Sequence, residues 1–281
     1  MRPSTQPESC FLQLNGARIH YLRAGEGPPL LLIHGVVGSA SIWRLNIPAL
    51  ARHATVYALD LLGMGGSERV PDLAAGLEDT ARRVLATMDA LGVAQADVAA
   101  ASHGGSVAMM LAALAPERVR SLILFAPANP YSTKVDWIVW FYDSALGAIA
   151  ARIAPKMPRW IQQIALRRMY GDSSRMLEGS LDPYREALRV PGTIPHLLNI
   201  VHGWSADMNS LREILPKLKG TPALLIWGDR DRVVSVESGR RLEKELGAEL
   251  VVFEGGGHLV FEEFAEDANR LIVEWLQPVS G

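Results

Sequence analysis

Six short, almost continuously apolar runs constrain the fold of this 281-residue chain more than any other feature of its sequence. They occupy residues 29–33, 55–59, 96–101, 119–125, 222–227 and 249–253. Runs of this length without polar alternation are typical of parallel strands that are buried on both faces of a sheet. Stretches with an apolar spacing near 3.6 residues occur at 77–91, 102–114, 235–246 and 265–276. Because strand and helix patterns alternate, the sequence predicts an α/β fold with a mostly parallel, doubly wound sheet.

Two parts of the chain depart from this alternation. Residues 11–14 and 18–23 alternate in polarity around Asn15-Gly16, which is a hairpin signal, so antiparallel strands are expected at the start. Between residues 129 and 215 no strand pattern occurs and prolines punctuate helical pieces, the first of them expected at 137–151. We therefore predict a core domain of residues 1–128 and 216–281 that carries a helical cap insertion of residues 129–215.

Composition excludes several classes of protein. The chain is 49% apolar and 21% charged, as in soluble globular domains, and its 28 basic and 30 acidic residues leave a net charge of −2 without runs of like charge. Nothing in this balance predicts a nucleic-acid partner or an anionic membrane surface. The most apolar tract, residues 137–151, is too short to cross a bilayer and contains Asp143, so stable membrane insertion is not expected. The single cysteine, Cys10, and the absence of a secretory pattern in the first ten residues favour a cytoplasmic setting.

One serine lies where a predicted strand meets a predicted helix. The run that ends at Ala101 continues as Ser102-His103-Gly104-Gly105 and then as a helical pattern. In a nucleophile elbow, a sharp turn of this kind exposes the nucleophile above the sheet and requires small neighbours. Ala100 replaces the glycine of the strict motif, for which we expect only a slightly tighter turn. Taken alone, the pattern also suits an ordinary capped helix start.

Other loops at the ends of predicted strands supply the remaining groups that acyl chemistry needs. A serine hydroxyl needs a neutral imidazole to accept its proton, and the imidazole needs a carboxylate to fix its tautomer. Asp231 follows the run at 222–227, and His258 follows the last run on a glycine-rich loop. Val36, in His34-Gly35-Val36 after the first parallel strand, could donate its backbone N–H to an oxyanion, together with the N–H of His103.

With these motifs in this order, the sequence resembles the α/β-hydrolase superfamily, in particular its cap-bearing branch of esterases and lipases. The likeness covers nearly the whole chain, including the glycine-rich segment 59–67. It implies that Ser102 is the nucleophile, His258 the base and Asp231 the acid, with Val36 and His103 forming the oxyanion hole. One departure is Phe264, which stands where many relatives have a proline before the last helix. Dehalogenases and epoxide hydrolases of this branch use an aspartate at the elbow, so the serine argues against both.

Other polar residues are expected to have structural roles. Asp229 is interpreted as shaping the turn before Asp231, Asp60 as ordering the glycine turn that follows it, and His34 as packing within its loop. The remaining histidines show no partner pattern; they are His20, His53, His196 and His202. No cluster of potential ligands has metal-site spacing, so neither a metal nor another cofactor is predicted.

The activity predicted from these residues is hydrolysis of carboxylic esters of small to medium hydrophobic substrates, through an acyl-enzyme. Aromatic side chains of the insertion, Trp140 and Trp204, are proposed to line the substrate pocket. The same triad could instead serve lactone hydrolysis, perhydrolysis or carbon–carbon bond hydrolysis beside a carbonyl. Carbon–carbon hydrolases of this fold commonly have asparagine before the serine, and Ala101 argues against that reaction. A non-catalytic ligand-binding protein of this fold is a further alternative, and the sequence does not indicate the oligomeric state.

Overall fold

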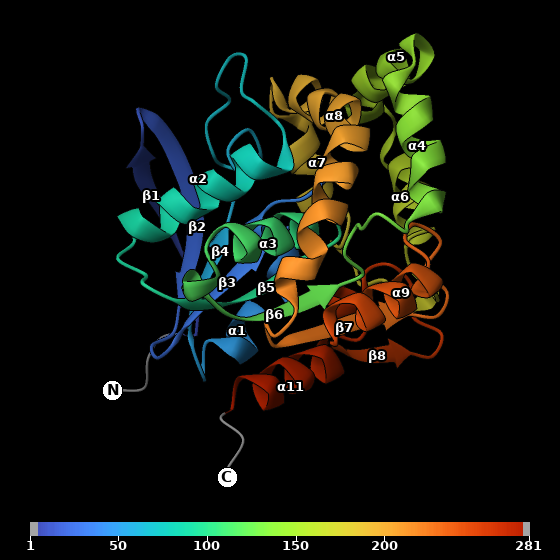
Figure 1. Ribbon diagram of the computed structural model, residues 1–281. Coiled ribbons are helices and arrows are strands. Elements are labelled where there is room, and N and C mark those ends of the chain that lie inside the picture. The colour runs from blue at the N-terminus through green and yellow to red at the C-terminus, as the bar shows by residue number, and fades with distance from the viewer. Residues whose placement is uncertain (1–4, 278–281) are drawn as a thin grey trace.

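The computed structural model describes residues 5–277 and places all of its strands in one sheet (Figure 1). The chain opens with the predicted hairpin, because β1 (Glu8–Leu14) and β2 (Ala17–Ala24) pair antiparallel. Asn15 and Gly16 of its turn have φ values of 50° and 86°. Positive φ at both central residues gives the turn a twist that matches the twist of the flanking strands.

The six apolar runs form the parallel part of the sheet, as predicted. They are β3 (Pro29–Ile33), β4 (Thr55–Leu59), β5 (Ala96–Ala101), β6 (Val119–Phe125), β7 (Ala223–Gly228) and β8 (Glu249–Phe253). The spatial order is β1-β2-β4-β3-β5-β6-β7-β8. All neighbours from β4 to β8 are parallel, whereas β2 joins β4 antiparallel. The prediction of an α/β hydrolase sheet is confirmed, and β7 begins one residue later than expected.

Helices cover both faces of this sheet (Figure 1). One face packs against α2 (Leu77–Ala90), α3 (His103–Leu114) and α9 (Val236–Leu246). The other face packs against η1 (Ala40–Trp43), α1 (Ile47–Leu50), α10 (Val260–Glu263) and α11 (Ala265–Leu276). A short η2 (Pro116–Arg118) precedes β6. The central parallel strands β3 to β7 are therefore buried on both sides, as their apolar runs require, whereas the edge strand β8 is only partly buried.

All elements between β6 and β7 are helical. They are α4 (Thr133–Asp143), α5 (Ala145–Ile153), η3 (Ala154–Lys156), α6 (Arg159–Arg167), η4 (Ser173–Arg175), α7 (Asp182–Arg189), α8 (Thr193–Ile214) and η5 (Leu215–Leu218). We call residues 129–215 the insertion. In Figure 1, α4 and α5 stand at its outer margin, and α8 runs from there back towards the sheet. No helix within the described residues 5–277 is long and apolar enough to cross a membrane.

The prediction of one helix over residues 137–151 is wrong, because the chain breaks between α4 and α5. Ser144 has an extended backbone, and its hydroxyl accepts a hydrogen bond from the N–H of Gly147 (3.1 Å), which caps α5. A Cβ at Gly147 would lie 1.9 Å from the carbonyl oxygen of Phe141. Glycine therefore permits the sharp turn between the helices, a signal that the apolar pattern alone did not reveal.

Candidate active site

Ser102 lies at a strained turn between β5 and α3. Its φ of 53° and ψ of −123° are unfavourable for a residue with a side chain, and such conformations concentrate at functional sites. The turn is close-packed: a Cβ at Gly104 would lie 2.4 Å from the carbonyl oxygen of His34, and one at Gly105 would lie 2.5 Å from Cβ of Pro127. The two glycines after Ser102 thus allow the helix to begin this near to the sheet.

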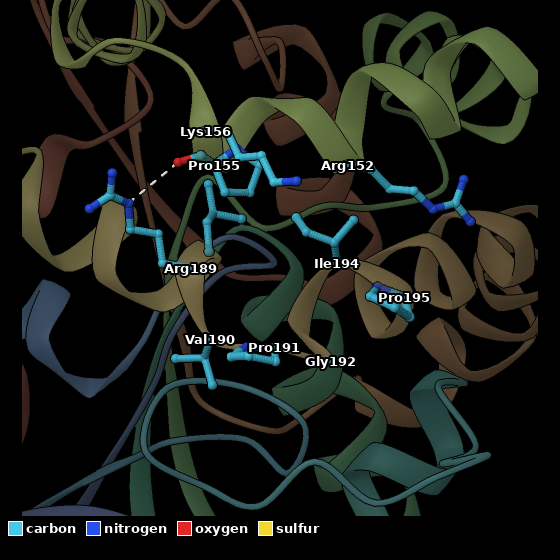
Figure 2. Close-up of a pocket in the computed structure, with 10 residues that line it drawn as sticks. Arg152, Pro155, Lys156, Arg189, Val190, Pro191, Gly192, Ile194 and Pro195 are labelled. Carbon is cyan, nitrogen blue, oxygen red and sulfur yellow. Dashed lines mark hydrogen bonds between the residues drawn. The ribbon is translucent and has the colours of Figure 1, made fainter.

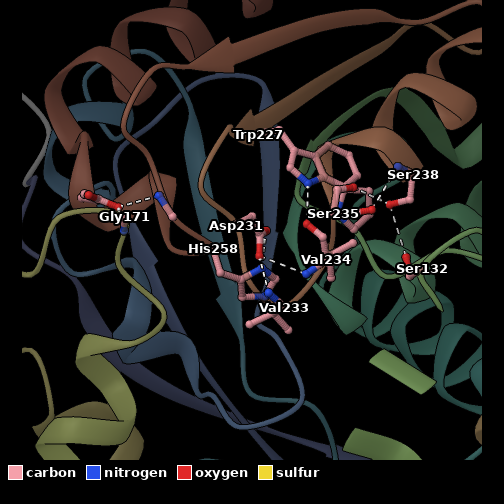
Figure 3. Close-up of polar contacts among 12 residues, drawn as sticks. Ser132, Gly171, Trp227, Asp231, Val233, Val234, Ser235, Ser238 and His258 are labelled. Atoms are coloured by element: carbon pink, nitrogen blue, oxygen red, sulfur yellow. Dashed lines mark hydrogen bonds and ion pairs between the residues drawn. The ribbon is translucent and has the colours of Figure 1, made fainter. Parts of the chain in front are cut away.

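His258 and Asp231 meet beyond the carboxyl ends of β7 and β8 (Figure 3). Nδ1 of His258 lies 2.8 Å from Oδ2 of Asp231, and both side chains are buried. The other carboxylate oxygen, Oδ1, accepts hydrogen bonds from the backbone N–H groups of Val233 (2.7 Å) and Val234 (2.9 Å). The fixed carboxylate places the proton on Nδ1 and leaves Nε2 of His258 free to accept another.

Asp229, the neighbouring carboxylate, is exposed and has a different partner. Its Oδ1 accepts a hydrogen bond from the N–H of Gly255 at 2.7 Å, on the loop before His258. Asp229 therefore shapes the loop, whereas Asp231 contacts the imidazole. Within residues 5–277 no hydrogen bond joins Ser102 Oγ to His258. In the absence of substrate, such contacts are often long and shorten only in the complex.

The loop after β3 packs directly against Ser102. A Cβ at Gly35 would lie 3.3 Å from Cβ of Ser102 and 3.9 Å from its Oγ. The backbone N–H groups of Val36 and His103 donate to no acceptor among the described residues. Two free donors beside a serine hydroxyl are what an oxyanion hole requires.

Two buried polar residues hold the loops around this site. His34 donates from Nδ1 to the carbonyl of Gly35 (2.8 Å) and accepts at Nε2 from the N–H of Leu61 (3.1 Å), and burial lowers its pKa. Asp60 accepts from the N–H groups of Ala40 and Gly66 and from His20. Burial alone would raise the pKa of Asp60, but these hydrogen bonds and His34 outweigh it and lower the pKa.

His20 has a partner that the sequence did not reveal. Its Nδ1 lies 2.6 Å from Asp60 Oδ2, and its Nε2 lies 3.0 Å from Oγ of Ser9. Ser9, His20 and Asp60 thus form a hydrogen-bonded chain of the same residue types as the candidate triad. Ser9, however, lies in the regular pairing of β1 with β2, without the strained turn of Ser102. Residue types alone therefore do not distinguish the candidate nucleophile from Ser9, whereas the backbone conformation does.

The ring of His103 is buried behind the candidate oxyanion donor. It stacks on Trp204 of α8 with a centroid separation of 6.2 Å, and neither ring nitrogen has a hydrogen-bond partner in the part of the chain that the structure describes. Burial, together with His34 and His196, lowers the pKa of His103 to about 4. Burial also lowers the pKa of His196, on α8, to about 4. Both imidazoles are therefore neutral at neutral pH.

The two tryptophans proposed to line a substrate pocket lie in different environments. Trp204 is buried between α8 and the elbow helix, against His103. Trp140 is 68% exposed on α4, where its ring meets that of Trp137 edge to face at 5.9 Å. The structure does not bring Trp140 to Ser102. Apolar side chains occur on several faces of α4, so its sequence pattern did not distinguish the inner face from the outer face.

Sequence reasoning missed two buried carboxylates next to the candidate base. Glu263 accepts hydrogen bonds from the N–H groups of Gly257 (2.8 Å), Gly171 (3.0 Å) and Asp172 (2.9 Å). The N–H of His258 itself donates to the carbonyl of Met169 at 2.7 Å. The loop that carries the imidazole is thus bonded to the insertion; Figure 3 draws one of these contacts, at Gly171.

Glu262 makes the second connection. Its carboxylate accepts from the hydroxyls of Tyr170 (2.7 Å) and Tyr184 (3.2 Å) and pairs with Arg44. Burial raises the pKa values of both tyrosines, and the negative charge of Glu262 raises them further. Two adjacent acidic residues before a helix usually indicate a solvent-exposed helix start. Only their hydrogen-bond partners, about 90 residues away along the chain, show that Glu262 and Glu263 hold the fold together.

A mostly parallel sheet with a strained serine at an elbow and a buried histidine–carboxylate pair at the same edge defines the class of α/β hydrolases. The family model described as "alpha/beta hydrolase fold" matches residues 28–265. The chain belongs to this family.

Relatives in the family differ in activity. The chain is 33% identical over 252 residues to a dihydrolipoyllysine-residue acetyltransferase component of an acetoin cleaving system from Pseudomonas putida, covering 89% of this chain and 64% of that protein. It therefore spans less than two thirds of that relative. A 2-hydroxymuconate semialdehyde hydrolase from Pseudomonas sp. CF600 is 29% identical, with 93% of this chain and 91% of that protein covered. The structure of a meta-cleavage product hydrolase from Pseudomonas fluorescens IP01 superimposes with a TM-score of 0.77 at 25% identity, with 95% and 96% of the two chains covered.

Proposed function

We propose that this hydrolase cleaves carboxylic esters of small to medium hydrophobic substrates, with Ser102 as nucleophile, His258 as base and Asp231 as acid. The observation that carries the proposal is the pairing of a serine at a strained elbow with a buried histidine whose tautomer a carboxylate fixes. The two free N–H groups at Val36 and His103 support it, since an acyl transfer develops charge on the carbonyl oxygen.

The proposed reaction proceeds in two halves. Nε2 of His258 accepts the hydroxyl proton while Ser102 Oγ bonds to the ester carbonyl carbon, and the resulting oxyanion accepts hydrogen bonds from Val36 and His103. The carbon–oxygen bond to the alcohol then breaks, and the imidazolium returns the proton to the departing alcohol. In the second half, water replaces the alcohol and releases the acid. The carboxylate of Asp231 stabilises the imidazolium in both halves.

Carbon–carbon bond hydrolysis beside a carbonyl is the second candidate. Two of the relatives named above support it, the 2-hydroxymuconate semialdehyde hydrolase and the meta-cleavage product hydrolase. Against it stands Ala101, which is buried and offers no polar group next to the nucleophile. A substrate with a carboxylate and an enol needs such groups, whereas a hydrophobic ester does not.

One comparison of substrates separates the candidates. Purified protein is given p-nitrophenyl esters from acetate to decanoate and, in parallel, a 2-hydroxy-6-oxo dienoate, with the Ser102→Ala protein as the control. Ester turnover that is lost in the Ser102→Ala protein supports the proposal. Turnover of the dienoate with negligible ester turnover would assign carbon–carbon hydrolysis instead. A protein that turns over neither and fails to react with a fluorophosphonate would be a binding protein.

The insertion, residues 129–215, is proposed to act as a cap that selects the substrate. Its Trp204 lies directly behind the elbow, against His103. Each CH₂ buried beneath a cap should raise kcat/KM about fourfold, from about 0.8 kcal/mol per CH₂. We expect Trp204→Ala to shift the preferred acyl chain to greater length. A length profile that the Trp204→Ala protein shares with wild type would mean that this side chain does not set specificity.

A further inference from the structure

The insertion exposes an unusual amount of apolar surface. Nine large apolar side chains in residues 137–164 are classed as exposed; they are Trp137, Ile138, Trp140, Phe141, Leu146, Ile149, Ile153, Trp160 and Ile164. Single exposed apolar residues are normal on soluble proteins, but contiguous groups mark interaction sites. This concentration on three consecutive helices therefore indicates a binding surface.

The exposed side chains of α4 and α5 have helical spacing. On α4 they include Trp137, Trp140 and Phe141, three and four residues apart, and on α5 they are Leu146, Ile149 and Ile153. Such spacing places each set on one side of its helix. The two helices pack against each other and stand at the outer margin of the molecule (Figure 1). We call these six residues the outer face.

The charge of this segment is opposite in sign to that of the whole chain. Residues 137–168 contain five cations, Arg152, Lys156, Arg159, Arg167 and Arg168, and one carboxylate, Asp143. That carboxylate lies 3.0 Å from Nδ1 of His202. Arg159 is paired with Asp182, outside this segment. The net charge of −2, which gave no reason to expect an anionic partner, thus conceals a local excess of positive charge.

Cations also surround a hollow at the end of α5. Arg152, Lys156 and Arg189 line a volume of about 290 Å³ together with prolines and aliphatic residues, and no acidic residue lines it (Figure 2). Of these three cations, only Arg189 makes a hydrogen bond to a described residue, a long one of 3.4 Å from Nε to the carbonyl of Pro155. Arg152, which lines the hollow, directly precedes Ile153, the last residue of the outer face. Apolar and cationic groups are thus adjacent in one region.

We propose that the outer face docks on the surface of a lipid bilayer that contains anionic lipids. Tryptophan and phenylalanine favour the boundary between headgroups and acyl chains, and neighbouring Lys and Arg are attracted to anionic headgroups. With 11 and 9 residues, α4 and α5 are too short to span a bilayer, so they lie along its surface. A second copy of the chain fits less well, because a two-fold contact would bring the same cationic region against itself.

The test is cosedimentation with vesicles, using the full chain as its Ser102→Ala variant so that catalysis does not alter the lipid. Vesicles of phosphatidylcholine alone are compared with vesicles in which roughly one third of the lipid is phosphatidylglycerol. We expect binding to the anionic vesicles that salt weakens, with a blue shift of tryptophan emission. In the Trp137→Ala/Trp140→Ala protein both signals should fall strongly. Neutralising Arg152 and Lys156 to Gln should weaken binding about fivefold per charge, from about 1 kcal/mol each.

A control for the charge substitutions neutralises two cations elsewhere in the chain. Arg52→Gln/Arg240→Gln removes two exposed cations from the core and should leave vesicle binding unchanged. Binding that is equal for the outer-face and control variants would overturn the proposal, as would an absence of binding to anionic vesicles. If wild type instead forms a dimer in sedimentation velocity that the tryptophan substitutions abolish, with no vesicle binding, the partner of this face is a second copy.

Discussion

Replacing His103 by phenylalanine should stabilise the protein, and the gain should grow in acid. The imidazole is buried, neither nitrogen has a hydrogen-bond partner among residues 5–277, and its pKa of about 4 lies below the ordinary 6.5. The folded state therefore binds fewer protons than the unfolded state, so the stability that depends on this group is complete above about pH 6.5 and declines as the pH falls towards 4. Near pH 5, about 1.5 pH units below the pKa of the unfolded state, the free energy of unfolding should be about 2 kcal/mol lower than at neutral pH.

The His103→Phe protein lacks this loss and keeps a ring to stack on Trp204. Its free energy of unfolding, from urea denaturation, should exceed that of wild type by about 2 kcal/mol more near pH 5 than near pH 7.5. At neutral pH a gain of about 1 kcal/mol is expected from removing unsatisfied buried nitrogens. His53→Phe, at an exposed turn, is the control and should show no such difference. A stability difference between His103→Phe and wild type that is the same at both pH values would refute the reasoning.

Further predictions concern the site and its supports. Asp231→Asn should lower kcat for an ester by about 10⁴-fold, and Asp229→Asn should lower it much less; the reverse ranking in steady-state kinetics would exchange their roles. Gly104→Ala should cost about 2 kcal/mol or more in urea unfolding, because its Cβ would lie 2.4 Å from a backbone oxygen. Gly203→Ala in α8 should cost nothing, because its Cβ would meet only Oδ2 of Asp207, at an ordinary contact distance of 3.8 Å. Glu262→Gln should cost roughly 3 kcal/mol, since it leaves a partly buried arginine unpaired; an unchanged urea midpoint would show that the pair is dispensable.

The parallel part of the sheet was predictable from sequence because its central strands are buried on both faces. Apolar runs such as residues 29–33 and 55–59 matched β3 and β4 to the residue, and the Asn15-Gly16 turn followed from local backbone preferences. Ser102, Asp231 and His258 stood out because each follows a strand, and parallel strands deliver their carboxyl ends to one edge. The local sequence pattern was therefore sufficient to predict these strands, the turn and the three candidate site residues.

Features that depend on distant partners were not predictable. His20 gave no signal, because Asp60 and Ser9 reach it only through strand pairing. In the sequence, Glu262 and Glu263 resemble a solvent-exposed helix start, whereas in the structure the insertion covers them and supplies hydrogen-bond donors to both. The pocket position predicted for Trp140 rested on its apolar character, which does not establish burial. In the structure its side chain on α4 is exposed.

The insertion leaves and re-enters the sheet between strands that are direct neighbours, since β6 pairs with β7. Because these strands are parallel, the insertion leaves at the carboxyl end of β6, and α8 and η5 return the chain to the amino end of β7. The sheet therefore fixes both attachment points, however long the intervening chain is. Closing a loop costs only about 0.6 kcal/mol more for each doubling of its length. Evolution or an engineer can thus exchange or lengthen this segment without displacing the serine on one side or the aspartate on the other. One limit lies at residues 169–184, where a replacement would have to supply partners for two buried glutamates. Another lies in α8, whose buried side chains, such as Trp204 and Leu211, belong to the core beside the sheet.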